Sequence, residues 1–347
     1  MVKHLSTHHN IDIVAEASNL AETKKKVIEL QPDVLVMNLV EHRPESIALV
    51  KELREHYFVP CIAMVGAAFG VELPNRIASS DFITKPRQES EMESFCNVLS
   101  TKIILAAKIK RSAPYNAAAD GSMPVIATSA KYGRVAPNMP TKEDIAGLDK
   151  RSRDGYVVAL GASTGGTDAL ECILKSFPAT MPPVLVVQHM PPVFTRLYSE
   201  RLDKYCAMTI KEAQDGDRLK QGLCLIAAGG FQMELKKDSK GYYVKCYQGE
   251  KVSGHCPSVD VMFSSVAETA GSKAIGALMT GMGADGAKGL LKMHQKGAYT
   301  IGQDKETCVV YGMPMEAYKL GACSEQQPLE NIGKALCRHL TDGWIKV

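Results

Sequence analysis

The feature that most constrains the fold of this chain is a short apolar run that stops at a glycine and continues into a helix. Residues 157–160 read Val-Val-Ala-Leu, Gly161 and Ser163 follow, and Gly165-Gly166 lead into a helical pattern from Thr167. Strand, tight turn and helix in this order are typical of an α/β sheet. A hydroxyl at such a turn serves as an exposed nucleophile or belongs to a phosphate cradle at a helix N-terminus.

The same alternation continues to the end of the chain. We predict strands at 184–188, 223–228, 274–279 and 298–302, a hairpin at 233–246, and helices at 194–205, 258–270, 287–295 and 329–340. Strands that alternate with helices form a parallel sheet covered by helices on both faces. The sequence therefore predicts a doubly wound α/β domain over residues 155–347, which we expect to carry the chemistry.

The N-terminal part alternates as well. We predict strands at 11–17, 33–39, 61–65 and 81–86, and helices at 20–30, 47–56 and 71–78. A longer amphipathic helix is expected from 87 to about 110. Residues 112–154 are rich in Ala, Pro, Gly, Ser and Lys without a sustained period, which is typical of a linker. The predicted organisation is a first domain at 1–90, a helix and flexible linker at 91–154, and the domain at 155–347.

Residues 11–86 resemble a response-regulator receiver domain of flavodoxin-like fold, on the Pro32-Asp33-Val34 approach to a strand and the closing Lys85-Pro86. The resemblance implies a phosphoacceptor aspartate six residues after Pro32, where this chain has Asn38, and a hydroxyl residue where it has Gly66. An amide cannot form an acyl phosphate. We therefore hypothesise a degenerate receiver with no phosphoacceptor.

The first strand of a receiver, with the acidic pair that holds magnesium, is also missing, because residues 1–10 are too short and polar to supply it. Without that pair the metal has no carboxylate cage. The missing strand is central in a receiver sheet. We expect either residues 1–10 or the catalytic domain to cover the gap, or the segment to be poorly ordered.

Composition narrows the class of protein. The chain has 347 residues, 45% of them hydrophobic and 23% charged, and a formal net charge of +3, which gives no reason to expect a nucleic-acid partner. Its ten cysteines are scattered without a C-x-x-C pair. With no apolar run of transmembrane length, we expect a cytoplasmic protein with reduced thiols and no membrane insertion.

Three loops stand at predicted strand ends, and each carries a residue that hydrolytic chemistry uses. They are Ser163, His189 and Asp285. The carboxyl ends of parallel strands meet at one edge of a sheet, so these loops can converge. A serine needs a base to become a nucleophile, and the base needs a carboxylate to orient it. His255, in the loop before the helix at 258, is a second possible base that spacing alone leaves open.

Each residue also has an ordinary structural explanation. A serine in a glycine-rich turn and an aspartate in a loop are often helix caps. The phosphate-cradle alternative lacks the acidic residue expected after the next strand, where Gln188-His189 stand, and the glycine spacing is not G-x-G-x-x-G. An ordinary α/β-hydrolase orders its triad as serine, acid, histidine, whereas here the histidine precedes the acid.

That order resembles one family closely, the chemotaxis protein-glutamate methylesterases (CheB). The similar stretches are GASTGG at 161–166, QHMPPVFT at 188–195, EAQDGDRLKQG at 212–222, HCPSVDVMF at 255–263, TGMGADGAKGL at 280–290 and QDKETCVVYGMPMEA at 303–317. The resemblance implies that Ser163 is the nucleophile, His189 the general base and acid, and Asp285 the orienting carboxylate. It also implies backbone oxyanion donors at Met282 and Thr164.

The implied reaction is hydrolysis of glutamate methyl esters on the cytoplasmic helices of chemoreceptors, and deamidation of glutamines there, without metal or organic cofactor. A histidine kinase or another chemotaxis protein is a further implied partner. Gln232 departs from the family, which usually has histidine there, and this puts a peripheral substrate contact in doubt. The alternative function is a non-catalytic, receptor-binding signalling adaptor that has kept the fold.

Overall fold

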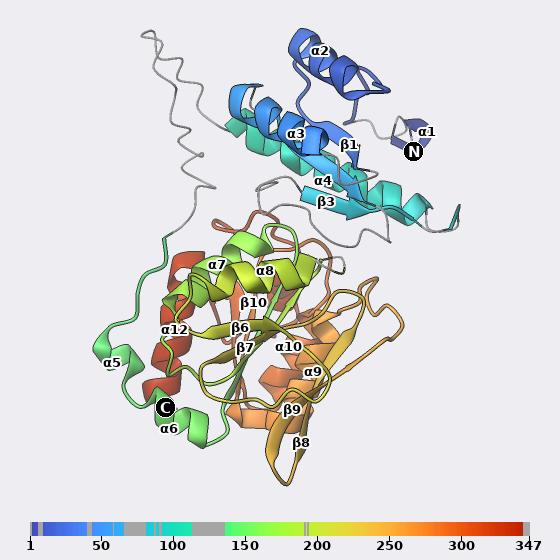
Figure 1. Cartoon of the computed structure of the whole chain (residues 1–347). Coiled ribbons are helices and arrows are strands. Elements are labelled where there is room, and N and C mark those ends of the chain that lie inside the picture. Colours follow the sequence, from blue (N-terminus) through green and yellow to red (C-terminus); the bar gives the residue numbers. More distant parts are fainter. Residues whose placement is uncertain are drawn as a thin grey trace. The chain divides into compact units, whose positions relative to one another are not determined.

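The computed structural model describes residues 2–5, 10–39, 44–57, 59–65, 81–86, 88–89, 92–112, 136–190, 192 and 194–342. The chain divides into two compact units, Met1–Gly133 and Arg134–Val347, hereafter the N-terminal and the C-terminal unit (Figure 1). Within the described ranges, no helix combines the length and the apolar character needed to cross a bilayer.

The N-terminal unit contains a small parallel sheet with strand order β1-β2-β3. Its strands are β1 (Leu35–Leu39), β2 (Cys61–Val65) and β3 (Asp81–Thr84), and its helices are α1 (Val2–Leu5), α2 (Leu20–Leu30), α3 (Pro44–Tyr57) and α4 (Met92–Ser112). These strands and helices, apart from α1, confirm the predicted elements to within a few residues at their ends. The predicted helix at 71–78 and Gly66 lie outside the described residues.

The prediction of a strand at 11–17 is wrong, because this segment forms no strand. Ile11 and Ile13 pack against the buried cluster of the unit, while Val14 is 54% exposed. In the 2-1-3-4-5 order of a flavodoxin-like sheet, the second strand pairs only with the first. The described sheet has no such first strand, so the segment has strand-like alternation but no neighbour for its backbone.

The N-terminal end of the chain contributes to this core. Leu5 is 4% exposed and joins a cluster with residues from β2, β3 and α4, among them Ile62, Ile83 and Leu99. Helix α1 also contacts α4. A residue of the segment 1–10 therefore packs on the apolar face of this sheet.

The C-terminal unit is built on a seven-stranded sheet in the order β12-β11-β10-β4-β5-β7-β6, and every neighbouring pair is parallel. The strands are β4 (Val157–Ala162), β5 (Val184–Gln188), β6 (Thr209–Glu212), β7 (Leu223–Ile226), β10 (Ala274–Leu278), β11 (Tyr299–Gln303) and β12 (Glu325–Gln327). β4 is the central strand. The chain first forms β5, β6 and β7 on one side of it, with β6 at the edge, and then β10, β11 and β12 on the other side. The predicted parallel α/β sheet is confirmed.

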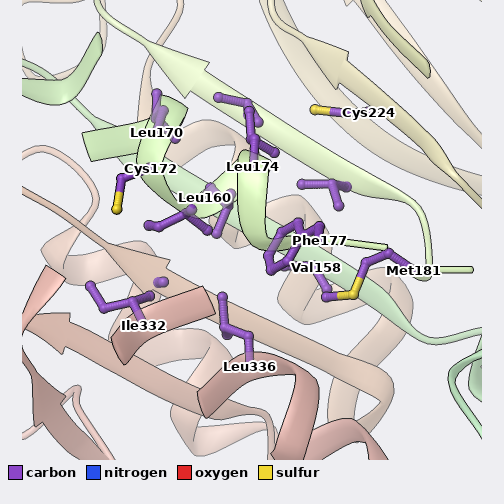
Figure 2. Packing of buried hydrophobic residues seen from close by; sticks show 14 of the residues in the cluster. Val158, Leu160, Leu170, Cys172, Leu174, Phe177, Met181, Cys224, Ile332 and Leu336 are labelled. Carbon is purple, nitrogen blue, oxygen red and sulfur yellow. The ribbon is translucent and has the colours of Figure 1, made fainter. Parts of the chain in front are cut away.

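Helices cover both faces of this sheet (Figure 1). They are α7 (Gly166–Ser176), α8 (Phe194–Asp203), α9 (Val259–Ala270), α10 (Ala287–Gln295), α11 (Met313–Lys319) and α12 (Leu329–Asp342). All of β4 is buried, and its side chains alternate between two cores. Val158 and Leu160 join the cluster with α7 and α12, where Figure 2 shows Leu174 and Ile332 close to them. Val157 joins the opposite cluster.

The segment 136–154, which we expected to belong to the linker, folds onto the C-terminal unit instead. It forms α5 (Lys142–Ile145) and α6 (Leu148–Arg153), both in contact with α12. Thr141 and Asp144 form a capping box at the start of α5, and Leu148 is fully buried in the core. The pattern T-x-x-D was visible in the sequence, but Ile145 and Leu148, the apolar side chains that pack on the core, show no helical period.

The antiparallel hairpin of β8 (Gln232–Asp238) and β9 (Gly241–Tyr247) is confirmed and forms a sheet of its own. Four further predicted helices correspond to α8, α9, α10 and α12. Besides α5 and α6, the C-terminal unit contains β6, α11 and β12, which were not predicted either. β12 has the sequence Glu-Gln-Gln, whose strand character comes only from pairing with β11. Short polar strands of this kind carry no periodic signal.

Candidate active site

The three predicted loops lie at one edge of the large sheet. Strand β4 pairs directly with β5 on one side and with β10 on the other. Ala162 stands in register with Gln188, and Gly161 with Leu278. Ser163, His189 and the loop 279–286 therefore leave the carboxyl ends of three adjacent strands. This edge, beside the strand where the order reverses, is where ligands bind in open α/β sheets.

Ser163 is held in a tight turn between β4 and α7. Its N–H donates to Thr280 O at 3.0 Å, and its carbonyl accepts from Gly166 N at 2.8 Å. Gly165 has a φ of +79°, and a Cβ there would lie 2.6 Å from Val309 Cβ. The backbone conformation and the close approach both require glycine at this position. Strand, turn and helix thus present the serine as a nucleophile elbow does.

Asp285 is the most completely fixed group at this edge. Its Oδ1 accepts from Ser258 Oγ at 2.7 Å and from Asp260 N at 3.0 Å. Its Oδ2 accepts from Val259 N at 2.8 Å and from His189 Nε2, also at 2.8 Å. The side chain is 1% exposed. It sits on the first N–H groups of α9, where the helix dipole favours an anion.

This environment decides the ionisation of the carboxyl. Burial alone would raise the pKa of Asp285, but the hydrogen bonds from His189, Ser258 and Asp260 N hold it below its ordinary value. The neighbouring Asp260 behaves in the opposite way, because burial raises the pKa of its carboxyl and the charge of Asp285 adds to this. Of these two buried acids, Asp285 is therefore the one whose surroundings favour the charged form.

His189 joins the acid to the serine side of the site. Its side chain is 8% exposed, and Nε2 is engaged by Asp285. A carboxylate only accepts, so the proton of the neutral ring lies on Nε2 and Nδ1 carries the lone pair. Nδ1 is buried and has no hydrogen-bond partner among the described residues. It is the nitrogen that can accept a proton from a nucleophile.

The ring of His255 stacks on that of His189, with centroids 3.7 Å apart and planes 7° apart. The two histidines that the sequence left as rival bases are therefore neighbours. Asp285 contacts His189, and the described residues include no hydrogen bond between Asp285 and His255. The described residues also include no hydrogen bond between the Ser163 hydroxyl and His189. Catalytic contacts of this kind often tighten only when substrate binds.

The two backbone groups expected to bind an oxyanion are both available. Within the described residues neither Met282 N–H nor Thr164 N–H donates a hydrogen bond to another protein group. Thr164 follows Ser163 directly, and a Cβ on Gly281, the residue before Met282, would lie 2.8 Å from Ser163 Cβ. Both donors therefore lie beside the serine. Donors in this arrangement stabilise charge that develops on a carbonyl oxygen.

Sequence reasoning missed several polar residues that hold these loops together. Gln188 Nε2 donates to Ser163 O at 2.9 Å and to His189 O at 3.4 Å. Thr280 Oγ1 donates to Thr164 O at 2.9 Å, and Gln303 Oε1 accepts from Thr280 N at 2.8 Å. All act on backbone groups. Their proximity to the predicted motifs was the only sequence signal, and it does not reveal which carbonyl or N–H each one reaches.

Gln232 stands where the resemblance leads us to expect histidine, and for that reason the sequence put a peripheral substrate contact in doubt. The side chain is 1% exposed. Its Oε1 accepts from Ser258 N at 2.9 Å, and its Nε2 donates to Glu250 O at 2.9 Å and to His255 O at 3.4 Å. All of these hydrogen bonds go to backbone groups, so the amide faces the protein. The sequence could not show this, because β8 lies in a separate sheet.

Asn38 lies in the N-terminal unit, in β1 opposite Met64, and is exposed. Lys85 follows β3 and is half-buried. No hydrogen bond between these two residues is present in the described ranges. The degenerate receiver thus stays a hypothesis that rests on the sequence.

Comparison with known proteins assigns the family. Residues 158–336 match the sequence model of the CheB methylesterase family. A protein-glutamate methylesterase/protein-glutamine glutaminase of Syntrophomonas wolfei is 39% identical over 97% of this chain and 92% of the relative. Relatives of the same name from Syntrophotalea carbinolica and Pectobacterium atrosepticum are 36% and 34% identical, each over 93% of its own length and over 98% and 99% of this chain.

A solved structure gives the same answer. The crystal structure of the Thermotoga maritima CheB methylesterase catalytic domain is 39% identical, with a TM-score of 0.52, and covers 53% of this chain and 97% of that domain. The chain belongs to the CheB methylesterase family, which confirms the predicted family, the α/β fold of the C-terminal unit and the class of enzyme, a carboxylic ester hydrolase of chemotaxis.

Proposed function

We propose that Ser163, His189 and Asp285 form the catalytic triad of a hydrolase that demethylates glutamate methyl esters on proteins. One observation carries the assignment. The buried Asp285 carboxylate engages His189 Nε2 at 2.8 Å and leaves Nδ1 open, at the strand end next to Ser163. An anion this deeply buried is costly to maintain. The four hydrogen bonds that the Asp285 carboxylate accepts are explained if this carboxylate orients a catalytic base.

The chemistry follows from these positions. Ser163 Oγ attacks the ester carbonyl carbon while its proton passes to His189 Nδ1, and the carbonyl electrons move onto the oxygen. The resulting anion is stabilised by the N–H groups of Met282 and Thr164. When the intermediate collapses, the C–O bond to the methoxy group breaks and His189 returns the proton, so that methanol leaves. Asp285 stabilises the imidazolium meanwhile.

A water molecule then completes the cycle. It attacks the acyl carbon as His189 takes one of its protons, and the glutamate carboxylate leaves as Ser163 regains its hydrogen. A glutamine side chain presents the same carbonyl with an amide nitrogen as leaving group, so the site is equally suited to deamidation with release of ammonia. The names of the relatives describe both reactions. The non-catalytic adaptor has no supporting observation.

The substrate is the side chain of another protein, and a glutamyl chain is too short to keep that protein away from the site. The loops around His189 expose apolar residues at Phe231, Val252 and Met282. Phe231 adjoins Gly230, whose N–H donates to Cys256 O at 3.1 Å, and Val252 pairs its backbone with His255. We infer that this rim contacts apolar residues beside the modified glutamate on the cytoplasmic helices of chemoreceptors. The enzyme acts in the cytoplasm, where those helices lie, with a histidine kinase or other chemotaxis proteins as partners.

The test is Ser163→Ala, with methanol release from a methylated receptor as the measurement. We expect the rate to fall to background, because the hydroxyl that forms the acyl enzyme is removed. Ser239→Ala, an exposed serine at the tip of the β8–β9 hairpin, is the matched control and should keep full activity. A fluorophosphonate should label Ser163 in the unmodified protein. Retained activity in Ser163→Ala, or labelling elsewhere, would refute the triad.

A further inference from the structure

Gln232 is a buried amide that the reaction does not use, yet its hydrogen bonds reach both sides of the catalytic base. It begins β8, in a hairpin that shares no strand pairing with the large sheet. The side chain is 1% exposed and every polar atom has a partner. A buried amide with complete hydrogen bonding holds its neighbours in one arrangement, because any shift leaves a donor or acceptor unpaired.

The oxygen of the amide supports the acid. Gln232 Oε1 accepts from Ser258 N at 2.9 Å. Ser258 is the N-cap of α9, and its Oγ donates to Asp285 Oδ1 at 2.7 Å. The backbone of the N-cap is thus fixed by Gln232 while its hydroxyl is committed to the catalytic carboxylate. Ser258 thus connects Gln232, the first residue of the hairpin, to Asp285.

The nitrogen of the amide supports the ring that covers the base. Gln232 Nε2 donates to Glu250 O at 2.9 Å and to His255 O at 3.4 Å. Both carbonyls belong to the segment 249–257, whose turn at 252–255 has positive φ values of 53° at Ser253 and 83° at Gly254. The turn closes with hydrogen bonds of 2.9 and 3.0 Å between Val252 and His255. It presents His255 flat against His189.

We infer that Gln232 is a positioning residue of the methylesterase site, acting on His189 through Ser258 and Asp285 on one side and through His255 on the other. This inference rests on the proposed role of His189 as general base. An amide fits the position because Ser258 N–H can only donate and the carbonyls of Glu250 and His255 can only accept. A carboxylate there has no donor, and an apolar side chain has neither function.

The first test is Gln232→Glu, assayed by methanol release from a glutamyl-peptide γ-methyl ester. The variant keeps the shape and the acceptor for Ser258 N–H but turns a carboxylate oxygen toward two carbonyls. We expect kcat to fall by about tenfold to 100-fold with KM nearly unchanged, because small displacements of catalytic groups have effects of this size. Gln221→Glu is the matched control: its Nε2 donates to Thr180 O at 2.9 Å, away from the site, and kcat should stay unchanged.

A double-mutant cycle separates positioning from general destabilisation. His255→Ala removes the ring through which the nitrogen of Gln232 acts. If the inference is right, Gln232→Glu should lower kcat much less in the His255→Ala background than in the wild type, because residues that act as a unit are not additive. Additive losses in kcat, or a wild-type kcat with only a lower melting temperature, would overturn it.

Further measurements distinguish a failure of this inference from a failure of the proposed function. Ser163→Ala is assayed in parallel, and if it stays active the proposed function fails, whatever Gln232 does. If Gln232→Glu does not fold, Gln232→Met takes its place in the cycle with His255→Ala, and additivity overturns the inference in the same way. In the folded variants, the ring resonances of His189 and His255 should shift in NMR spectra, and unchanged resonances in Gln232→Glu would also contradict it.

Discussion

The two units of this chain were predicted from the same sequence pattern, yet only one of them completes it. In the C-terminal unit every predicted strand of the sheet found a parallel neighbour, and β4 is paired on both sides. In the N-terminal unit three strands pair, whereas residues 11–17 form none. Alternation of apolar and polar residues makes a segment competent for a strand. A neighbouring backbone is what turns it into one.

The same contrast holds for the polar residues at the strand ends. At the edge of the large sheet, the buried Asp285 carboxylate holds His189 by a hydrogen bond of 2.8 Å, and Ser163 stands in a turn fixed by backbone hydrogen bonds. Near the end of β1 the N-terminal unit offers Asn38, an exposed amide. The edge of the large sheet has both the residue types and the surroundings that chemistry needs, whereas the described residues at the ends of β1 and β3 offer Asn38 and Lys85 with no hydrogen bond between them.

The largest expected effect tests the edge that we consider catalytic. Asp285→Asn removes the charge that stabilises an imidazolium at His189 and offers a donor toward the ring. We expect kcat to fall by about 10⁴-fold, as for the acid of other serine triads, with methanol release as the measurement and circular dichroism to show an intact fold. Asp203→Asn is the control, since an amide oxygen can still accept from Ile210 N. A loss of less than about tenfold would exclude an orienting role.

The next effect concerns the core of the C-terminal unit. Leu148→Ala opens a cavity where a fully buried side chain packs between α6 and the sheet. We expect the free energy of unfolding to fall by about 2–5 kcal/mol in urea titrations. Val14→Ala, in the segment that forms no strand, should change it by less than about 0.5 kcal/mol. Equal effects would mean that 136–154 is the tether that its composition indicates.

The smallest effect is expected in the N-terminal unit, where a substitution should not make the chain accept a phosphoryl group. Asn38→Asp restores the carboxylate that a receiver would phosphorylate, but the acidic pair that would hold magnesium is missing from the sequence. After incubation with acetyl phosphate and magnesium, we expect no stable phosphoryl group in either the wild type or the variant, measured by mass spectrometry. Phosphorylation anywhere in residues 1–90 would contradict the degenerate-receiver hypothesis.

Individual residues show most clearly what could be predicted from the sequence. Ser163, His189 and Asp285 were found because each follows an apolar strand of recognisable period, and parallel strands bring their ends to one edge. Ser258 begins the helix predicted at 258–270, but its bond to Asp285 could not be predicted. Leu148 was assigned to the linker, because one buried side chain leaves no period. The hydrogen bonds of Gln232 were not predicted, because an amide does not show in the sequence whether it faces water or backbone.

The sequence by itself determined the class of fold, the family and the residue types at the strand ends, because these depend on local patterns and on motifs that are contiguous in the chain. Spacing alone left open which histidine meets the acid, although the resemblance favoured His189, and only the tertiary structure shows the contact. His189 and His255 are separated by 66 positions in the numbering, and their rings stack on each other. The choice between them rests on a hydrogen bond of 2.8 Å to a carboxylate fixed by the start of α9, a contact made across three chain segments.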